Sequence, residues 1–300
     1  MMLKANTAIQ ASKKSKDINP VLITLILSII ISGPQAIFTQ LYYYYLLFVK
    51  NLEAGEAKRL GLELVSSKSY IFLLLYLTTI SLLLAYVFSR KILKRSKESL
   101  GLVDRSKFKK YGLGILIGII SIAIIIGSLY ILGHARLSLN ISNISPLPLI
   151  IIIIGWIIQG FEEEFILRSI LMNQFAQRGR IEMAIFANSL IFAILHLGNH
   201  GFNGLALINL FLLGLFLSLL FYLTDSIYLP AAVHSFWNMS QANIFGISVS
   251  GTSQLTNTIL KTELLGEKFL TGANFGIEAS LITSLILLIG ICYLYKKTKK

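Results

Sequence analysis

The sequence predicts an all-α membrane protein, a polytopic bundle of about eight transmembrane helices. Hydrophobic residues make up 55% of the 300-residue chain and charged residues only 14%, whereas a soluble domain is about one quarter charged. Several apolar runs also exceed the roughly 18 residues that a helix needs to cross a bilayer. The chain is therefore expected to lie in a membrane.

The apolar runs define the expected order of spans along the chain. They lie at residues 20–48, 70–88, 113–133, 149–172, 183–197, 205–223, 229–247 and 278–295. The first run is longer than the 7–15 apolar residues, roughly, of a cleavable signal peptide, so the first helix is expected to remain as an anchor. The single cysteine, Cys292, excludes an intramolecular disulfide and a four-cysteine metal site.

Basic residues are divided unevenly between the two expected sides of the membrane. With the N-terminus inside, the inner segments hold 20 of the 27 Lys and Arg residues and the outer segments hold 7. Because basic residues collect in cytoplasmic segments, both termini are predicted to be cytoplasmic. The same rule accounts for the net charge of +13, and no soluble domain carries a basic patch that would bind nucleic acid.

Three regions follow from this topology. Residues 1–144 form an N-terminal transmembrane region with the first three spans and a basic cytoplasmic loop at 89–112. Residues 145–245 hold the next four spans and are the expected catalytic core. Residues 246–300 contain an outer loop, the last span and a basic tail.

The fourth expected span contains the stretch FEEEFILR, with three glutamates and an arginine. A charge at the centre of a bilayer costs several kcal/mol or more, so such residues mark a functional site or a buried ion-pair network. Glu164 and Arg168 are four residues apart and can pair on one helix face. Glu163 is rotated from Glu164 by about 100° and can face another neighbour. Glu162 has no evident partner and is expected at a helix end or facing water.

Two histidines fall in expected spans, each with a companion four residues away. Phe192 precedes His196, and Asn238 follows His234. Glu163 and His196 lie about 10–14 residues, or roughly 15–20 Å, from the inner ends of their helices. A pocket that opens toward the cytoplasm is therefore expected.

These residue types suit hydrolysis of an amide bond by activated water. A carboxylate and an imidazole can together deprotonate water as a general base. A second histidine and an asparagine can donate hydrogen bonds to the oxyanion of a tetrahedral intermediate. Neither serine nor cysteine is needed as a nucleophile.

The order of the motifs resembles the CAAX-protease and bacteriocin-processing (CPBP, or Abi) family of intramembrane proteases. The resemblance rests on Glu163-Glu164-x-x-x-Arg168, Phe192-x-x-x-His196 and His234-x-x-x-Asn238, within about residues 145–245. It implies that Glu163 and His196 activate water, that His234 and Asn238 hold the oxyanion, and that Glu164 and Arg168 support the site. Ser169 stands where many members have glycine, which we expect to affect packing more than chemistry.

A metal-free reaction is the preferred expectation, with zinc as the alternative. Glu163, His196 and His234 could supply three zinc ligands and leave a position for water. His196 and His200 also have the spacing of two histidines on a zinc-binding helix, but Gly198 lies between them and His200 is expected at the membrane interface.

The expected function is an intramembrane endopeptidase that acts on membrane-associated peptides or proteins in a bacterial cell membrane. Candidate substrates are CAAX-type tails, leader peptides of bacteriocins or pheromones, and membrane-protein segments, and a role in self-immunity is included. One alternative is a non-catalytic membrane scaffold or regulator that retains the fold. A proton-coupled transporter would also use intramembrane Glu and His, but it predicts inverted repeats that the sequence lacks.

Overall fold

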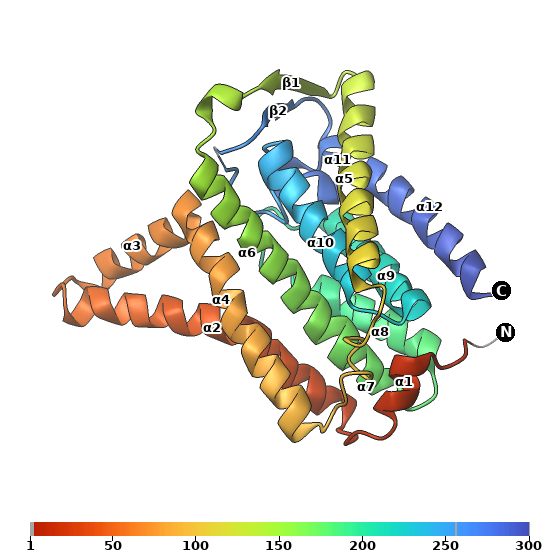
Figure 1. The fold of residues 1–300 in the computed structure, drawn as a ribbon. Helices are drawn as coiled ribbons and strands as arrows, with labels where there is room; N and C mark the ends of the chain where they lie inside the picture. Colours follow the sequence, from red (N-terminus) through yellow and green to blue (C-terminus); the bar gives the residue numbers. More distant parts are fainter. Residues whose placement is uncertain (1–2, 256, 300) are drawn as a thin grey trace.

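The computed structural model describes residues 3–255 and 257–299, and it is an assembly of long helices with one small sheet (Figure 1). This confirms the predicted helical bundle. The principal helices are α2 (Pro20–Phe48), α3 (Ala54–Ser66), α4 (Lys68–Val87), α5 (Lys107–Ile131), α6 (Pro146–Glu164), α8 (Ile181–Ile194), α9 (Gly204–Thr224), α10 (Tyr228–Met239) and α12 (Leu281–Thr298).

Five of the described helices are long and apolar enough to cross a membrane, rather than the eight spans expected. They are α2, α4 with its continuation to Ile92, α5, α9 and α12. The other three expected spans are also helical. Helix α6 continues through a π-helical segment, η3 (Phe165–Met172), into α7 (Asn173–Ala176), while α8 and α10 have only 14 and 12 residues.

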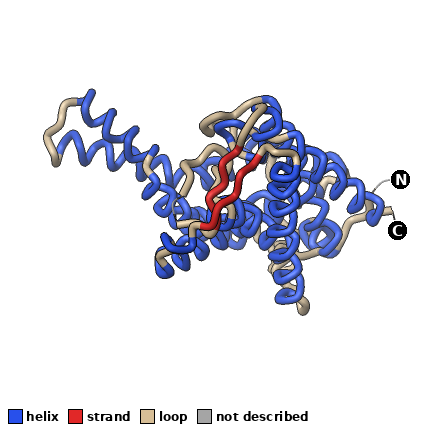
Figure 2. The backbone as a smooth tube through the Cα atoms, turned by 90° about the horizontal axis from the view of Figure 1, so that it is seen from above, coloured by secondary structure: helices blue, strands red, loops and turns tan. Residues whose placement is uncertain are grey.

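The sheet was not expected from the sequence. Strand β1 (Ala135–Leu139) pairs antiparallel with β2 (Leu260–Leu264), with Ala135 opposite Leu264. Both strands lie in segments expected to be outer loops, and they cover one end of the bundle (Figures 1 and 2). We call this end, made of residues 132–145, 195–203, 245–255 and 257–280, the sheet end.

The opposite end gathers most of the basic segments. It consists of residues 3–19, 88–106, 173–180, 224–227 and 295–299, and we call it the basic end. Arg95 donates to Gln174 at 2.7 Å, and Arg178 pairs with Asp17 at 3.0 Å. Burial of Arg95 lowers the pKa of its guanidinium to about 10, although Asp17 opposes this shift. These contacts hold the basic loop and the N-terminal segment against the end of the core.

Helix α10 lies at the centre of the bundle, against α5 and α6, because glycines on both neighbours let the backbones approach. A Cβ atom at Gly118 would lie 2.8 Å from the carbonyl oxygen of Val233. One at Gly160 would lie 2.6 Å from the backbone nitrogen of Ser235. These close approaches fix the position of His234, which lies between Val233 and Ser235.

Helices α2, α3 and α4 form a hairpin whose tip projects from the rest of the molecule (Figure 2). The hairpin packs on α6 where Leu75 lies against Gly155. Its outer face exposes large apolar side chains, including Val21, Ile29 and Leu83 at 69%, 69% and 61%. Such a face suits contact with lipid rather than water.

Candidate active site

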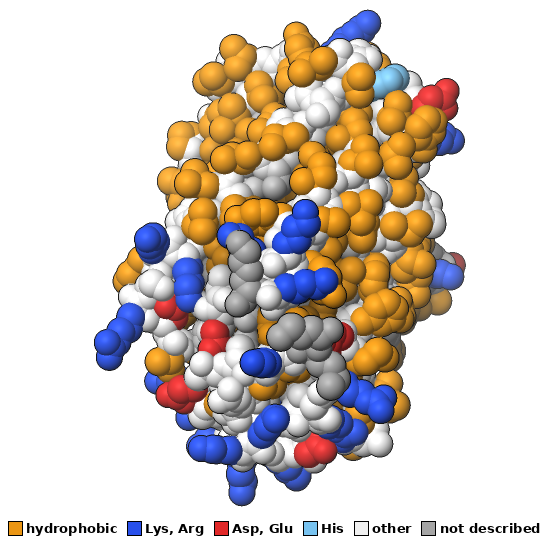
Figure 3. All heavy atoms as spheres, turned by 90° about the vertical axis from the view of Figure 1, so that its right-hand side faces the viewer, with side chains coloured by type: hydrophobic (Ala, Val, Ile, Leu, Met, Phe, Trp, Pro, Cys, Tyr) orange, Lys and Arg blue, Asp and Glu red, His pale blue; other side chains and the backbone are white. Residues whose placement is uncertain are grey.

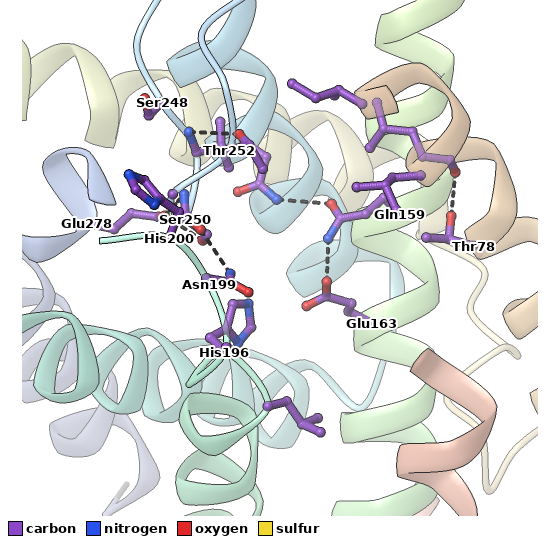
Figure 4. A pocket seen from close by; sticks show the side chains of 18 of the residues that line it. Thr78, Gln159, Glu163, His196, Asn199, His200, Ser248, Ser250, Thr252 and Glu278 are labelled. Carbon is purple, nitrogen blue, oxygen red and sulfur yellow. Dashed lines mark hydrogen bonds between the residues drawn. The ribbon is translucent and has the colours of Figure 1, made fainter. Parts of the chain in front are cut away.

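One pocket of about 950 Å³ lies between the hairpin, α6, α10 and loops of the sheet end. Glu163, His196, His234 and Asn238, the four residues expected to carry the chemistry, all line it. Figure 4 shows Glu163 and His196 on facing sides of this space. The tertiary structure therefore brings together residues that are up to 75 positions apart in the sequence.

The residues reach the pocket from different local structures. Glu163 lies on α6, and His234 and Asn238 lie one turn apart on α10. His196 was expected within a helical span, but it lies outside the helix, because α8 ends at Ile194 and a turn follows. His200 lies in the same non-helical stretch and is exposed, so the spacing of His196 and His200 does not fall on a zinc-binding helix.

Glu164 holds two partners through a single oxygen. Its Oε1 accepts a hydrogen bond from Arg168 Nη1 at 2.7 Å and another from His234 Nδ1 at 2.9 Å. Arg168 also donates from Nη2 to the carbonyl oxygen of Gly214 at 3.2 Å. The predicted Glu164–Arg168 pair is confirmed, but its contact is with His234 rather than with Glu163.

Phe192 is the packing centre of the site. The guanidinium carbon of Arg168 lies 4.8 Å from the centre of its ring. The rings of His196 and His234 lie against it, with centroid separations of 4.9 and 5.8 Å. Phe192 therefore packs against both imidazoles and the arginine.

Glu163 is held by a residue that the sequence reading missed. Gln159 Nε2 donates to Glu163 Oε1 at 2.5 Å, and Gln159 Oε1 accepts from Asn238 Nδ2 at 3.0 Å. The other oxygen of Glu163 lies 3.9 Å from His234 Nε2. Gln159 precedes Glu163 by four residues on the same helix face, and this spacing was the signal that could have identified it.

His196 has one ring nitrogen occupied and one available. Its Nδ1 donates to the carbonyl oxygen of Phe192 at 2.8 Å. With the proton on Nδ1, Nε2 of a neutral ring is a hydrogen-bond acceptor. The ring can therefore take a proton from a group in the pocket.

Glu162 is fully buried, so the expectation of a helix-end or water-facing position is wrong. Its side chain is at the wall of the pocket, and neither carboxylate oxygen has a hydrogen-bond partner among the described residues. The reason is helical geometry. Gly155, two turns earlier, packs on Leu75, so Glu162 shares a helix face that the hairpin covers.

The described residues contain no group of three His, Cys, Asp or Glu side chains arranged to hold a metal ion. Glu163, His196 and His234, the expected zinc ligands, line the same pocket but do not form such a group. His234 Nδ1 bonds to Glu164 and His196 Nδ1 to the carbonyl oxygen of Phe192, so Nε2 is the remaining nitrogen of each ring. Zinc stays the alternative expectation for this site.

A pocket that opens toward the cytoplasm was predicted, and its lining shows which segments surround it. Its loop residues come from 198–200, 248–254 and 273–274, all at the sheet end, and from the hairpin. Of the described residues, none from the basic end lines it. The reason is that α7 and the end of η3 pack against the basic loop, where Asn173 donates to the carbonyl oxygen of Ser99 at 2.9 Å. The hydroxyl of Ser169 donates to the carbonyl oxygen of Leu100 at 2.8 Å.

Comparison with known proteins agrees with the geometry. None of the curated proteins compared with the chain matches it. Residues 145–240 match the family described as type II CAAX prenyl endopeptidase Rce1-like, and all seven expected site residues lie in that range. The match covers roughly a third of the chain and coincides with the expected core at 145–245. Through this region the chain is similar to the CAAX-protease family of membrane endopeptidases, which supports the resemblance found in the sequence.

Proposed function

We propose that the protein is an intramembrane endopeptidase in which Glu163 and His196 activate a water molecule. The family match supports a CAAX-type membrane endopeptidase in general. The observation that carries the mechanism is the pocket itself, where Glu163 and His196 lie on facing sides (Figure 4). A carboxylate and an imidazole so placed can share the proton of a water that binds between them.

The attack would proceed from this water. Glu163 or His196 accepts the proton as the oxygen attacks the carbonyl carbon of the scissile peptide, and a tetrahedral intermediate forms. The accepted proton then passes to the leaving amine, so the peptide bond breaks and the carboxylate and imidazole return to their starting forms. Gln159 keeps one oxygen of Glu163 occupied and leaves the other directed toward the pocket.

Asn238 and His234 would bind the oxyanion of the intermediate. Asn238 uses one N–H for Gln159 and has a second available. His234 uses Nδ1 for Glu164, so it donates to an oxyanion from Nε2 only when both ring nitrogens carry protons. Donors placed where negative charge develops lower the barrier, and removal of one typically costs about 100- to 1,000-fold in rate.

The substrate is proposed to be a membrane-associated peptide or protein. The hairpin wall of the pocket combines apolar side chains such as Ile71 and Leu74 with the polar Gln35, while Ser250 and Thr252 give the loop wall a polar character. An extended peptide with apolar side chains fits such a cavity. CAAX-type tails, bacteriocin leader peptides and membrane-protein segments are the substrate classes to compare.

The test is Glu163→Gln against Glu162→Gln as a matched control one residue away. Amino-terminal sequencing of membrane and secreted peptides by mass spectrometry would compare cells that carry the wild type and each variant. We expect a set of cleavages to disappear with Glu163→Gln and to persist with Glu162→Gln at equal protein levels. If Glu163→Gln leaves every cleavage and phenotype intact, the chain acts as a scaffold rather than a protease.

A further inference from the structure

The rim of the pocket at the sheet end consists of loop segments that are hydrogen-bonded to one another. The backbone N–H of Gly251 donates to the carbonyl oxygen of Phe275 at 2.9 Å. Asn199 donates to the carbonyl oxygen of Ser250 at 2.9 Å. The three segments that surround the opening are therefore hydrogen-bonded to one another.

This rim is also tied to the helix that carries His234 and Asn238. Glu278 Oε2 accepts from both the backbone nitrogen and the hydroxyl of Ser250 at 2.7 Å, and its Oε1 accepts from Trp237 Nε1 at 3.0 Å. Trp237 lies on α10 next to Asn238. The opening and the proposed oxyanion donors thus share one framework, which indicates that access at the sheet end is part of the fold.

The floor of the pocket is closed on the other side. Leu167 lines the pocket. Residues 168–172, which follow it toward the basic end, are all buried. Asn173 continues this packing against the basic loop. Within the part of the chain that the structure describes, no lining residue of the pocket belongs to the basic end.

The charge distribution then orients the opening. The basic end holds 15 of the 27 Lys and Arg residues, whereas the sheet end holds three, Arg136, Lys261 and Lys268. Figure 3 shows Lys and Arg side chains gathered over that end of one face, while apolar side chains cover the middle. Basic segments next to membrane helices stay on the cytoplasmic side. The sheet end, with the pocket's rim, then lies on the other side of the membrane.

We propose that the active-site pocket takes its substrate from the non-cytoplasmic face of the membrane. The substrate class is a peptide segment at the outer surface, either an exported peptide or the outer juxtamembrane part of a membrane protein. The substrate class rests on the proposed protease function. The orientation of the pocket in the membrane is independent of that function. A tail that is lipidated and held at the cytoplasmic surface would not reach this opening.

Cysteine labelling tests the orientation without any assay of activity. In a Cys292→Ser background, Gln254→Cys and Asn274→Cys place thiols at exposed positions of the rim, and Lys97→Cys places one in the exposed basic loop. A membrane-impermeant maleimide is applied to intact cells and, separately, to permeabilised cells. We expect both rim cysteines to react equally in the two conditions and Lys97→Cys to react only after permeabilisation.

Three outcomes overturn the proposal. One is rim cysteines that need permeabilisation while Lys97→Cys reacts in intact cells, because the pocket would then face the cytoplasm. Another is labelling of all three positions in intact cells, because the molecules would then not share a single orientation in the membrane. The third is rim cysteines that never react, because the opening would be closed.

The orientation and the protease function fail separately. If the rim labels from outside but Glu163→Gln leaves all cleavages intact, the proposed function fails and the orientation stands. If Glu163→Gln abolishes cleavages but the rim labels only from inside, the protease function stands and the outer substrate class is wrong. Cleavage sites lost with Glu163→Gln provide the matching check, because they should map to exported or outer juxtamembrane sequence.

Discussion

His234 donates from Nδ1 to Glu164 Oε1 at 2.9 Å, and this bond determines which ring nitrogen faces the pocket. Arg168 donates to the same oxygen at 2.7 Å. All three side chains are almost completely buried, with 0% exposed for Glu164 and Arg168 and 4% for His234. Glu164 therefore has two functions, to orient an imidazole and to neutralise a buried guanidinium.

The two functions of Glu164 can be separated by substitution. We expect Glu164→Gln to lower the free energy of unfolding by about 3–5 kcal/mol, because Arg168 is left as an unpaired buried charge. Activity should fall by about 100-fold, since misplacement of a reacting group by 1 Å can cost that much. Thermal unfolding in detergent and a peptide-cleavage assay measure the two effects.

The double variant Glu164→Gln/Arg168→Met is the control for this prediction. It should recover most of the stability, because the unpaired charge is gone, but it should not recover activity, because His234 still lacks its carboxylate acceptor. Recovery of both would show that Glu164 acts on the site only through Arg168.

Gln159 should be a positioning residue for Glu163. Gln159→Leu removes the donor to Glu163 Oε1 and the acceptor for Asn238, so we expect kcat to fall by roughly 10- to 100-fold with little change in KM. Gln40→Leu makes the same substitution at an exposed position of α2 outside the pocket and should leave the kinetics unchanged. A loss confined to KM would instead place Gln159 in substrate binding.

Close packing of α6 on α10 predicts that Gly160 cannot be replaced. A Cβ atom there would lie 2.4 Å from the hydroxyl of Ser235 and 2.6 Å from its backbone nitrogen, so Gly160→Ala must displace α10. We expect a loss of about 1–3 kcal/mol in unfolding free energy, as for overpacked cores, together with reduced activity. Gly127→Ala on α5, where no atom lies within 4 Å of the added Cβ, should stabilise the helix by roughly 0.5–1 kcal/mol.

The buried carboxyl group of Glu162 should lower the stability of the folded protein. Its two carboxylate oxygens are buried without a hydrogen-bond partner among the described residues, and a buried unsatisfied polar group costs about 1–3 kcal/mol. Glu162→Leu removes this cost at similar volume, so we expect a higher melting temperature and retained cleavage. A lower melting temperature would mean that the carboxyl group has a stabilising partner in the membrane.

The Asp104–Lys110 pair predicts a pH-dependent contribution to stability. Burial disfavours the charged carboxylate, but hydrogen bonds from Lys110, Ser226 and Ser106 outweigh it and hold the pKa of Asp104 well below its usual range. The folded state therefore binds this proton less readily than the unfolded state, whose pKa is about 3.9. The stabilisation is present above about pH 4 and is lost as the pH falls through the folded value.

We therefore expect Asp104→Asn to lower the melting temperature at pH 7. The difference from wild type should shrink as the pH falls from 4 toward 3, roughly the range in which the unfolded carboxyl becomes protonated. Melting curves of both proteins across this range provide the measurement. A difference that stays constant with pH would contradict a role for the charge of Asp104.

The sequence predicted the helical content and the region of the site, because both depend on local pattern. Apolar runs separated by charged segments define membrane helices, and spacing of four residues places Glu164 with Arg168 and Phe192 with His196. The doubt about a zinc-binding helix at His196 and His200 was justified, because α8 ends at Ile194 and both histidines lie beyond it. The sheet was missed because β1 and β2 are short and gain their stability from pairing across more than 100 residues.

By itself the sequence indicated a helical membrane protein, with its basic segments on one side and its candidate site residues between 163 and 238. Only the tertiary structure decided that Glu164 orients His234, that Gln159 links Glu163 to Asn238, and that Glu162 is buried under the hairpin. It also placed loops of the sheet end and the hairpin around the pocket. The reason is that hydrogen bonds and openings depend on which helix faces meet, and these contacts join residues distant in the chain.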